Sequence, residues 1–481
     1  MLYRFRWVSC QLEALEHCLP PNLRQVLENL PKTLDETYEQ ILKGINKTRK
    51  DTAHRLLQCI TIASRPLRVE ELAELLAFDF PASSWVGIPT LKENWRWDDQ
   101  EEAVLSTCSS LIVIVPKGDS RVVQFSDSSV KEYLTSPRLA RSPHGDVSRF
   151  HIDLKSAHTI MAQVCLATLL RPDEHARNSD AKGSPLAEYA ARHWVEHTQF
   201  DKVSLRVRDG MDDLFDSSKP HFAAWLRVHD VDKPWFFFTP RSKVRSGSPL
   251  YYAAFCGFYD LAERLIMKHP EQVNARGGLN LSPLLAALYK RQFRVANLLY
   301  MHGATVDVQD SHDNTPLHEA SKYGKVDMMC WLLEHGAHAN HRNSVRRTPL
   351  HDAAYCTELD AVQVLLEHHA DVNSQDGTGT TPLYEVLTRA SGPEGKVVDI
   401  VRRLLEYGAD LNISGHGHSP ALHQASSRGW LELSRLLLSY GAMVDAKDKT
   451  GRTPFQVAAS LAVSGEHDEI MKLLLEHGAV P

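Results

Sequence analysis

From residue 248 to the end of the chain, apolar residues return in two fixed arrangements. The first is a short phrase in which Ser or Thr and then Pro usually precede an apolar residue, as in TPLHEA at 315 and TPLHDA at 348. Its apolar residue recurs at intervals of 34, 33, 33, 33, 39 and 33 positions, at Leu250, Leu284, Leu317, Leu350, Leu383, Leu422 and Phe455. The second is a leucine pair followed by Gly-Ala, as in LLEHGA at 332. Two landmarks with one period predict a stacked array of seven repeats.

The third copy shows how the chemistry of one repeat predicts its structure. Thr315 is suited to cap a helix whose first position is Pro316, because proline has no N–H to leave unpaired there. A second apolar helix covers 326–333, and Gly336 suits the left-handed conformation that ends it. The polar stretch 340–347 is expected to form a protruding finger. One such helix pair cannot bury its apolar face alone, so neighbouring pairs must stack on it.

This half of the chain resembles the ankyrin-repeat family, because Thr-Pro-Leu-His-x-Ala with a 33-residue period is that family's signature. The resemblance implies a solenoid of helix-turn-helix units with finger loops and a concave recognition surface. Extra residues near 390–395 and 463–465 are expected to form loops, as insertions in repeat proteins do. Three histidines recur inside the helix-start phrase and are predicted to connect adjacent copies by hydrogen bonds: His318, His351 and His423.

The first half of the chain has a different pattern. Residues 22–77 read as amphipathic helices, with a short helix at 69–76 after Pro66. Another helix is expected at 98–110, two strands at 111–115 and 121–125 around a turn, and a helix at 129–134. Three helices followed by a two-stranded wing predict a winged-helix domain. The fold class is therefore mainly α: an ankyrin-type solenoid preceded by an α-helical and winged-helix region.

Four segments of this half also resemble a known region. LPKTLDETYEQIL at 30, RPLRVEELAELLAFD at 65, FSDSSVKEYL at 125 and YAARHWVEH at 189 are similar to the region that follows the NACHT nucleotide-binding domain in fungal NACHT-ankyrin proteins. Asp127 stands where that family commonly has His. The resemblance implies a P-loop NTPase upstream, but no GxxxxGK followed by Ser or Thr occurs; the nearest stretch, 392–397, has different glycine spacing and ends in Val397. NTPase activity is not expected.

The patterns predict four parts. Residues 1–22 are interpreted as the trailing edge of a missing NTPase domain, 23–140 as the helical and winged-helix domain, 141–247 as a helical connector and cap, and 248–481 as the repeat array. Connector helices are expected near 153–170 and 186–197. The apolar cluster 232–240 is expected to cover the first repeat, because the end of a stack must be capped; the alternative is an exposed docking patch.

Composition narrows the class of protein. The net charge of −6 is shared by both halves, so neither half is suited to binding a phosphate backbone. Eight cysteines without a paired spacing predict reduced thiols. The first residues lack the pattern of a signal peptide, and no apolar run is long enough for a membrane span. The predicted location is intracellular, either nuclear or cytoplasmic.

The candidate motifs for DNA binding, metal binding and hydrolysis do not predict an active site. The helix that would read DNA begins with Asp98 and carries Asp99, Glu101 and Glu102 close behind, which oppose phosphate binding. The histidines near 335–341 and 416–423 lack partners at the spacing of a metal site. Chance matches to hydrolase motifs occur at 128–131 and 417–421 without the required context. We therefore expect no catalytic residue, no metal, no cofactor and no small-molecule substrate.

Binding of a protein partner to the concave surface is the function that remains. The first helices contribute the predicted residues Phe255, Tyr289, Lys290, Lys322, Tyr323, Tyr355, Ser427, Arg428 and Trp430. The fingers contribute Gln309, Ser311, His341, Arg342, Asn343, Gln375, Asp376, His416, Lys447, Asp448 and Lys449. Tyr, Trp and Arg are the residue types that dominate interface energies. The predicted function is a non-enzymatic interaction scaffold with a regulatory role, for example as a transcriptional co-regulator. Two alternatives remain: a short form of a NACHT-type immune switch, and a regulator that binds DNA through its winged helix.

Overall fold

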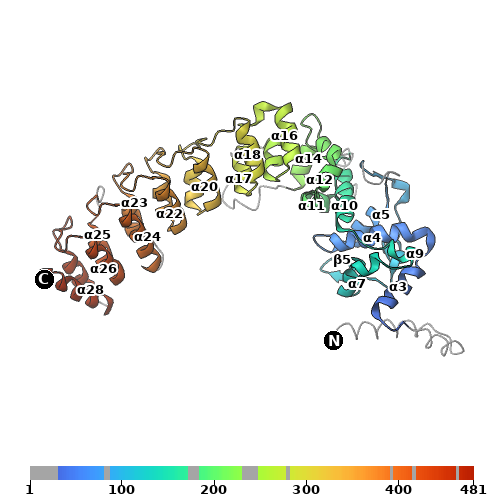
Figure 1. Cartoon of the computed structure of the whole chain (residues 1–481), viewed down its shortest axis with the longest axis horizontal. Coiled ribbons are helices and arrows are strands. Elements are labelled where there is room, and N and C mark those ends of the chain that lie inside the picture. Colours follow the sequence, from blue (N-terminus) through green and yellow to red (C-terminus); the bar gives the residue numbers. More distant parts are fainter. Residues whose placement is uncertain are drawn as a thin grey trace. The chain divides into compact units, whose positions relative to one another are not determined.

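The computed structural model describes residues 31–80, 87–171, 184–229, 247–277, 282–389, 394–413, 419–461 and 465–481. The chain divides into two compact units, 1–242 and 243–481, and each is described by itself. Figure 1 shows the order of their elements along the chain. Five sequence interpretations fall wholly or mainly outside the described residues: the NTPase edge at 1–22, the apolar cluster 232–240, the insertions at 390–395 and 463–465, and the binding residue His416.

The first unit begins with a winged-helix region. Its helices are α3 (Leu34–Gly44), α4 (Lys50–Ile62), α5 (Val69–Leu76), α6 (Gln100–Cys108) and α7 (Ser128–Leu134), with short 3-10 turns η2 (Lys47–Arg49) and η3 (Glu93–Trp95). Its strands are β1 (Leu67–Arg68), β2 (Phe78–Asp79), β3 (Thr90–Leu91), β4 (Ile112–Lys117) and β5 (Ser120–Phe125). The predicted helices and wing strands are confirmed, with ends that differ by one or two residues.

The wing sheet has one strand more than the sequence predicted. β4 and β5 form the expected antiparallel hairpin, but β1 also pairs with β5, so that Leu67 lies opposite Val123. The two-stranded wing was therefore incomplete. A strand of two residues is too short to show an alternating pattern, which is why it escaped detection.

A buried glutamate holds the start of α5. Both carboxylate oxygens of Glu71 are bonded: Arg65 donates to them at 2.6 and 2.8 Å, and Arg68 donates through its side chain at 2.9 Å and its backbone N–H at 2.8 Å. Burial raises the pKa of Glu71, but the hydrogen bonds from Arg65 and Arg68 outweigh it and lower the pKa below its ordinary value. The charged form of Glu71 therefore stabilises this turn.

The rest of the first unit is helical. It contains α8 (Pro137–Ala140), α9 (Gly145–Ser148), α10 (Leu154–Leu169), α11 (Ala187–Gln199), α12 (Val203–Arg206), α13 (Arg208–Leu214) and α14 (His221–Val228). The two connector helices predicted from sequence correspond to α10 and α11, which pack against each other. Beside them Trp194, Phe215 and Trp225 form a buried aromatic cluster, and the Trp225 indole N–H donates to the Ala191 carbonyl at 3.0 Å.

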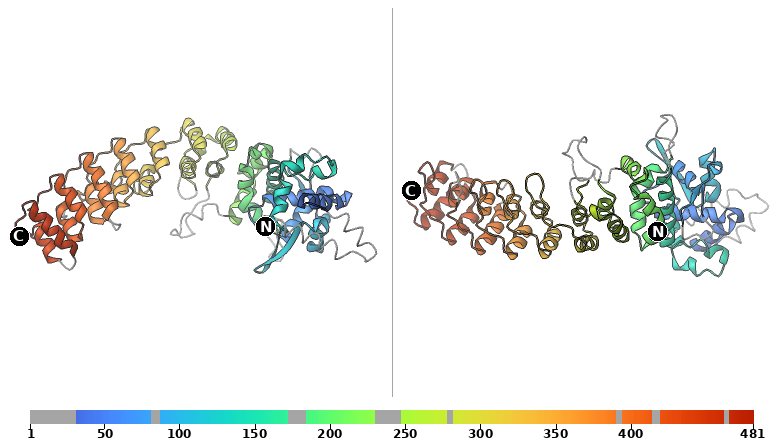
Figure 2. Two further views of the ribbon diagram at one scale, coloured as in Figure 1. Left: turned by 60° about the horizontal axis from the view of Figure 1, so that its bottom comes forward. Right: turned by 90° about the horizontal axis from the view of Figure 1, so that it is seen from above.

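The second unit is a stack of helix pairs, which Figure 2 shows in two views. The first helices of the pairs are α15 (Pro249–Phe255), α17 (Pro283–Tyr289), α19 (Pro316–Lys322), α21 (Pro349–Tyr355), α23 (Pro382–Arg389), α25 (Ala421–Arg428) and α27 (Pro454–Ser460). The second helices are α16 (Tyr259–Lys268), α18 (Phe293–Met301), α20 (Val326–Glu334), α22 (Leu359–Glu367), α24 (Glu394–Glu406), α26 (Leu431–Ser439) and α28 (Gly465–Glu476), and η5 (Pro270–Gln272) follows α16.

The local predictions for the repeat are confirmed. Thr315 precedes α19 in extended conformation and forms a capping box with His318, while Pro316 takes the first helical position. Gly336 follows α20 with a φ of +90°. The neighbouring first helices α19, α21 and α23 pack in sequence, so each buries its apolar residues against the next.

The insertion sites needed correction. Glu394 and Gly395 begin α24, which has 13 residues where α20 and α22 have 9, and Gly465 is the first residue of α28. The prediction of loops is wrong for Glu394, Gly395 and Gly465, whereas residues 390–393, 463 and 464 lie outside the described residues. Glu394 is favoured in a first helical turn because its charge complements the helix dipole.

Candidate functional site

The predicted binding residues differ widely in exposure. Tyr323 and Tyr355 are 47% and 44% exposed. Residues that are also exposed are Lys322, Gln309, Ser311, Arg342, Gln375, Lys447 and Lys449. The remaining described ones, apart from Phe255, are half-buried: Tyr289, Lys290, Ser427, Arg428, Trp430, His341, Asn343, Asp376 and Asp448.

Phe255 does not belong to the accessible surface. It is only 7% exposed, and the Lys290 ammonium lies 4.5 Å from the centre of its ring. The sequence register placed it on the recognition face, but the long side chain of the next repeat covers it. Phe255 is a packing residue.

The recurring histidines connect one repeat to the next, as predicted. His351 Nδ1 accepts the Thr348 backbone N–H at 3.2 Å, and its Nε2 donates to the Thr380 carbonyl at 2.9 Å. Equivalent Nε2 bonds run from His318 to the Arg347 carbonyl at 3.1 Å and from His423 to the Arg452 carbonyl at 2.8 Å. Each ring thus joins the start of its own first helix to the following finger.

The Nδ1 atoms of His318 and His351 accept a backbone N–H, which requires neutral rings. Burial lowers the pKa of His351 to about 4 and also lowers that of His318. Among the described residues, no group forms a hydrogen bond with the buried Nδ1 atom of His423. Pro420 stands in the capping position of that repeat and has no N–H to donate.

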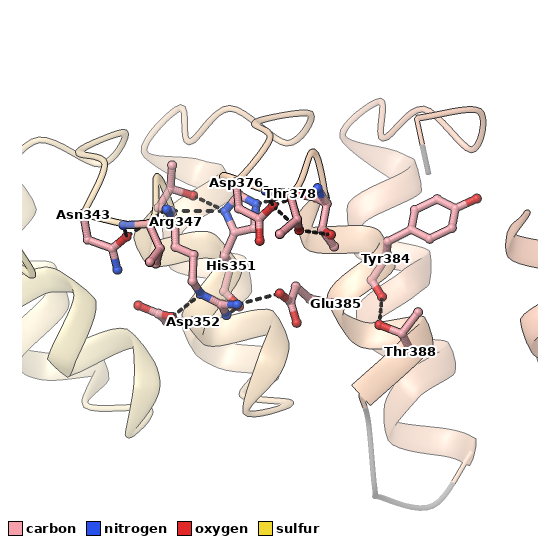
Figure 3. Close-up of polar contacts among 12 residues, drawn as sticks. Asn343, Arg347, His351, Asp352, Asp376, Thr378, Tyr384, Glu385 and Thr388 are labelled. Carbon is pink, nitrogen blue, oxygen red and sulfur yellow. Dashed lines mark hydrogen bonds and ion pairs between the residues drawn. The ribbon is translucent and has the colours of Figure 1, made fainter. Parts of the chain in front are cut away.

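Three carboxylates occupy the same place in successive repeats. Glu319, Asp352 and Glu385 each follow the fourth residue of the helix-start phrase in the third, fourth and fifth copies. Arg347, from the finger before α21, lies between the last two (Figure 3). Its Nε donates to Asp352 at 3.1 Å and its Nη1 to Glu385 at 2.5 Å.

Arg347 has two further neighbours. Its Nη2 donates to the His351 carbonyl at 3.2 Å, and its guanidinium lies 5.4 Å from the ring centre of Tyr355. The Arg347 and Glu385 side chains are only 15% and 2% exposed. The arginine is therefore held by two carboxylates, one carbonyl and one aromatic face.

A polar pocket of about 280 Å³ lies one repeat earlier. The side chains predicted from sequence that line it are Lys322, Asn343 and Tyr355. The lining also includes Asn314, His318, Glu319, Arg347 and Asp352, which sequence reasoning did not select. The signal for the carboxylates was present, because an acidic residue recurs at one position of three consecutive phrases.

The pocket carboxylates are partly desolvated. Burial raises the pKa of Glu319 above its ordinary value, and Lys322 offsets only part of that effect. Burial likewise raises the pKa of Asp352, although Arg347 acts in the opposite direction. An additional cation nearby would therefore stabilise the ionised form of both carboxylates.

A second pocket lies in the winged-helix region. It has a volume of about 620 Å³ and is lined by Arg49, Trp95, Arg96 and Trp97 together with residues of α6. Trp95 and Trp97 are 46% and 45% exposed. Arg121 of the wing is paired with Glu101 at the start of α6, so the charge of this arginine is already neutralised.

Within the described ranges, no three His, Cys, Asp or Glu side chains are grouped as a metal site would require. The same part of the chain contains no helix that is long and apolar enough to cross a bilayer.

Comparison with known families identifies both regions. A model described as "Ankyrin repeats (3 copies)" matches residues 284–376 and 387–481. The chain contains an ankyrin array. A second model, "GPI inositol-deacylase, winged helix domain", matches residues 38–144 in front of this array. The winged-helix and ankyrin predictions are thereby confirmed.

The chain is similar in sequence to two known proteins, and each match covers part of the chain and part of the relative. It is 31% identical over 326 residues to azaphilone pigments biosynthesis cluster protein L of Monascus ruber, covering 63% of this chain and 66% of that protein. It is 32% identical over 259 residues to human ankyrin repeat and SOCS box protein 16, covering 52% and 56%. The chain thus spans less than two thirds of either relative.

A solved structure is similar in sequence to the ankyrin array. The ankyrin repeat domain of Bcl-3 is 29% identical, with 47% of this chain and 99% of that chain covered and a TM-score of 0.41. The assignment of the repeats rests on the family model.

Proposed function

We propose that the chain is a non-enzymatic scaffold whose ankyrin array presents its first helices and fingers to a protein partner. The observation that supports this most directly is the combination of exposed Tyr323 and Tyr355 with the 280 Å³ pocket between their repeats. Tyrosine supplies contact area at a low cost in conformational entropy, and a pocket gives a partner side chain a fixed place. Ankyrin repeats as a class act through protein partners.

The frame around this surface favours binding without large rearrangement. The first helices α19 and α21 each begin with a capping box, and the histidine bonds connect successive repeats from buried positions. Interactions on a preorganised surface lose less free energy to ordering than those on mobile loops. The surface would therefore act by rigid presentation.

A regulatory role belongs to the same proposal. A scaffold influences a pathway through the partner it holds, for example as a transcriptional co-regulator. The Monascus ruber relative is named for a pigment biosynthesis cluster, which favours a role in the control of such a cluster.

The test is affinity capture with the full chain. Tyr323→Ala combined with Tyr355→Ala is expected to abolish capture of specific partners, which mass spectrometry identifies. Tyr407→Ala combined with Tyr440→Ala is the matched control, because these tyrosines are 43% and 44% exposed but follow second helices. If both double variants retain the same partners, the proposed surface is wrong.

A further inference from the structure

The carboxylates Glu319, Asp352 and Glu385 of successive repeats form a row, and we call the space between two neighbours in this row a slot. One slot is filled by a side chain of the protein and the other is open. Between Asp352 and Glu385 the space is filled by Arg347, which comes from the residue immediately before the capping threonine of its repeat. Its counterpart one repeat earlier, before Thr315, is Asn314. Asparagine is too short to reach a carboxylate two helices away, so the corresponding space between Glu319 and Asp352 remains open.

Asn314 is also occupied elsewhere. Its side-chain amide donates to Asp310 at 3.1 Å, and its oxygen accepts from Asn343 at 2.8 Å. The first bond holds Asn314 in its own finger, and the second joins it to the next finger. The open space is the 280 Å³ pocket, which Glu319 and Asp352 line from successive repeats.

The charges of the open slot favour a cation. In the described part of the chain, the Glu319 carboxylate has no hydrogen bond or ion pair. Asp352 accepts a hydrogen bond from Arg347 through Oδ1 only. Two cations line the pocket. Arg347 is already bonded to Asp352 and Glu385, and Lys322, whose ammonium lies 5.3 Å from the centre of the Tyr323 ring, forms no ion pair with any described residue. Three carboxylates, counting Glu385, face the two cations Arg347 and Lys322.

We propose that this pocket binds the guanidinium group of an arginine side chain presented by the protein partner, in the way that Arg347 occupies the next slot. The inference rests on the proposed function and names the chemistry of the partner. Arginine fits better than lysine, because the filled slot uses three separate N–H donors from a planar group toward Asp352, Glu385 and a carbonyl. Tyr355 also lines the pocket, and its ring shows the contact in the filled slot, where it lies 5.4 Å from the Arg347 guanidinium.

The full chain should be incubated with a printed array of random dodecapeptides. Wild type is expected to select peptides enriched in arginine. In the best selected peptide, replacement of that arginine by citrulline should weaken binding about tenfold to a hundredfold, because a charge-assisted hydrogen bond contributes about 1.5–3 kcal/mol. Citrulline keeps the shape of the side chain and removes its charge.

Two variants test the slot itself. Asp310→Asn with Asn314→Arg copies the Asn343 and Arg347 pair of the next finger and is expected to fill the slot from within, which removes the arginine preference. Glu319→Gln removes a carboxylate that has no internal partner and should weaken the preference without unfolding the repeat. Glu334→Gln on α20 of the same repeat is the matched control. Because Glu334 is exposed, this variant should change neither the arginine preference nor the stability of the repeat.

The outcomes separate the two proposals. Selection of peptides without an arginine preference overturns the slot and leaves the scaffold function standing. An arginine preference that survives both slot variants also overturns it, as does a preference for lysine or for acidic peptides. Failure to select any peptide overturns the slot, and the scaffold proposal then falls or stands by the tyrosine capture experiment. Circular dichroism melting checks that each variant is folded.

Discussion

Replacement of His351 tests whether the cross-repeat hydrogen bonds stabilise the array. His351 is fully buried and joins the Thr348 N–H to the Thr380 carbonyl. In His351→Ala the Thr348 N–H loses its partner, whereas the Thr380 carbonyl still accepts the Asp376 N–H at 3.0 Å. A buried polar group left unpaired costs about 1–3 kcal/mol and a lost hydrogen bond about 0.5–1.5 kcal/mol, so the substitution is expected to cost about 1.5–4.5 kcal/mol of local stability.

The chain supplies its own control for the capping part of this effect. In the last repeat Gln456 takes the place of the histidine, and its Oε1 accepts the Thr453 N–H at 3.2 Å. His351→Gln should therefore keep the cap and lose only the bond to Thr380, at a cost of about 1–2 kcal/mol.

The pH dependence follows from the same geometry. Nδ1 of His351 accepts an N–H, so a second proton has no place there, and burial lowers the pKa from 6.5 to about 4. Because the folded-state pKa is the lower one, this stability is present above pH 6.5 and is lost as the pH falls toward 4. At about 1.4 kcal/mol per pH unit, wild type should lose about 2 kcal/mol at pH 5 through this group.

The assay is amide hydrogen exchange of the full chain, followed by mass spectrometry over α21 and α23. A local measurement is preferred because a chain of two units does not unfold in one step. A loss of about 2 kcal/mol corresponds to about thirtyfold faster exchange after correction for the intrinsic rate. The reasoning is refuted if His351→Ala changes local stability by less than about 1 kcal/mol, or if His351→Gln retains the wild-type pH dependence.

Three further predictions concern the effect on stability of a buried charge, of glycine backbone conformation and of aromatic packing. Glu71→Gln should lower the stability of the first unit by about 3 kcal/mol in thermal unfolding, and in wild type that stability is present above the ordinary glutamate pKa and is lost as the pH falls through the lower folded-state value. Gly324→Ala and Gly336→Ala should each cost about 1–3 kcal/mol by urea denaturation, because φ is +59° and +90° at these positions; the carboxylate of Glu358, 2.4 Å from the new Cβ at position 324, lies at the end of a flexible side chain and can move away. Phe255→Ala should destabilise the first repeat by about 3–5 kcal/mol but leave peptide selection unchanged.

Local and periodic features of the fold were readable from the sequence. The cap at Thr315, the terminating Gly336 and the stacked first helices all follow from residue chemistry that acts within one repeat or between equivalent neighbours. The role of His318 and its counterparts was also predictable, since a buried histidine that recurs in one phrase must find the same partner each time. Periodicity turns a tertiary contact into a sequence pattern.

Features that depend on side-chain reach were not readable in this way. Phe255 sits at an exposed register position, yet a lysine from the adjacent repeat covers it. Strand β1 has no periodic pattern because it is only two residues long. The sequence did not predict the pocket, because the pocket exists only where the short Asn314 leaves the space between two carboxylates empty. That difference becomes clear only in the structure, where Arg347 fills the equivalent space in the next repeat.

The residue before each capping threonine has a consequence for how such an array could change. At that position the third, fourth and fifth copies carry Asn314, Arg347 and Thr380, on the same helical frame. One codon at each finger therefore determines whether a slot is closed by the chain itself or left for another molecule. An array of this kind could acquire or lose a recognition site by point mutation at a finger, with no alteration of the fold that supports it.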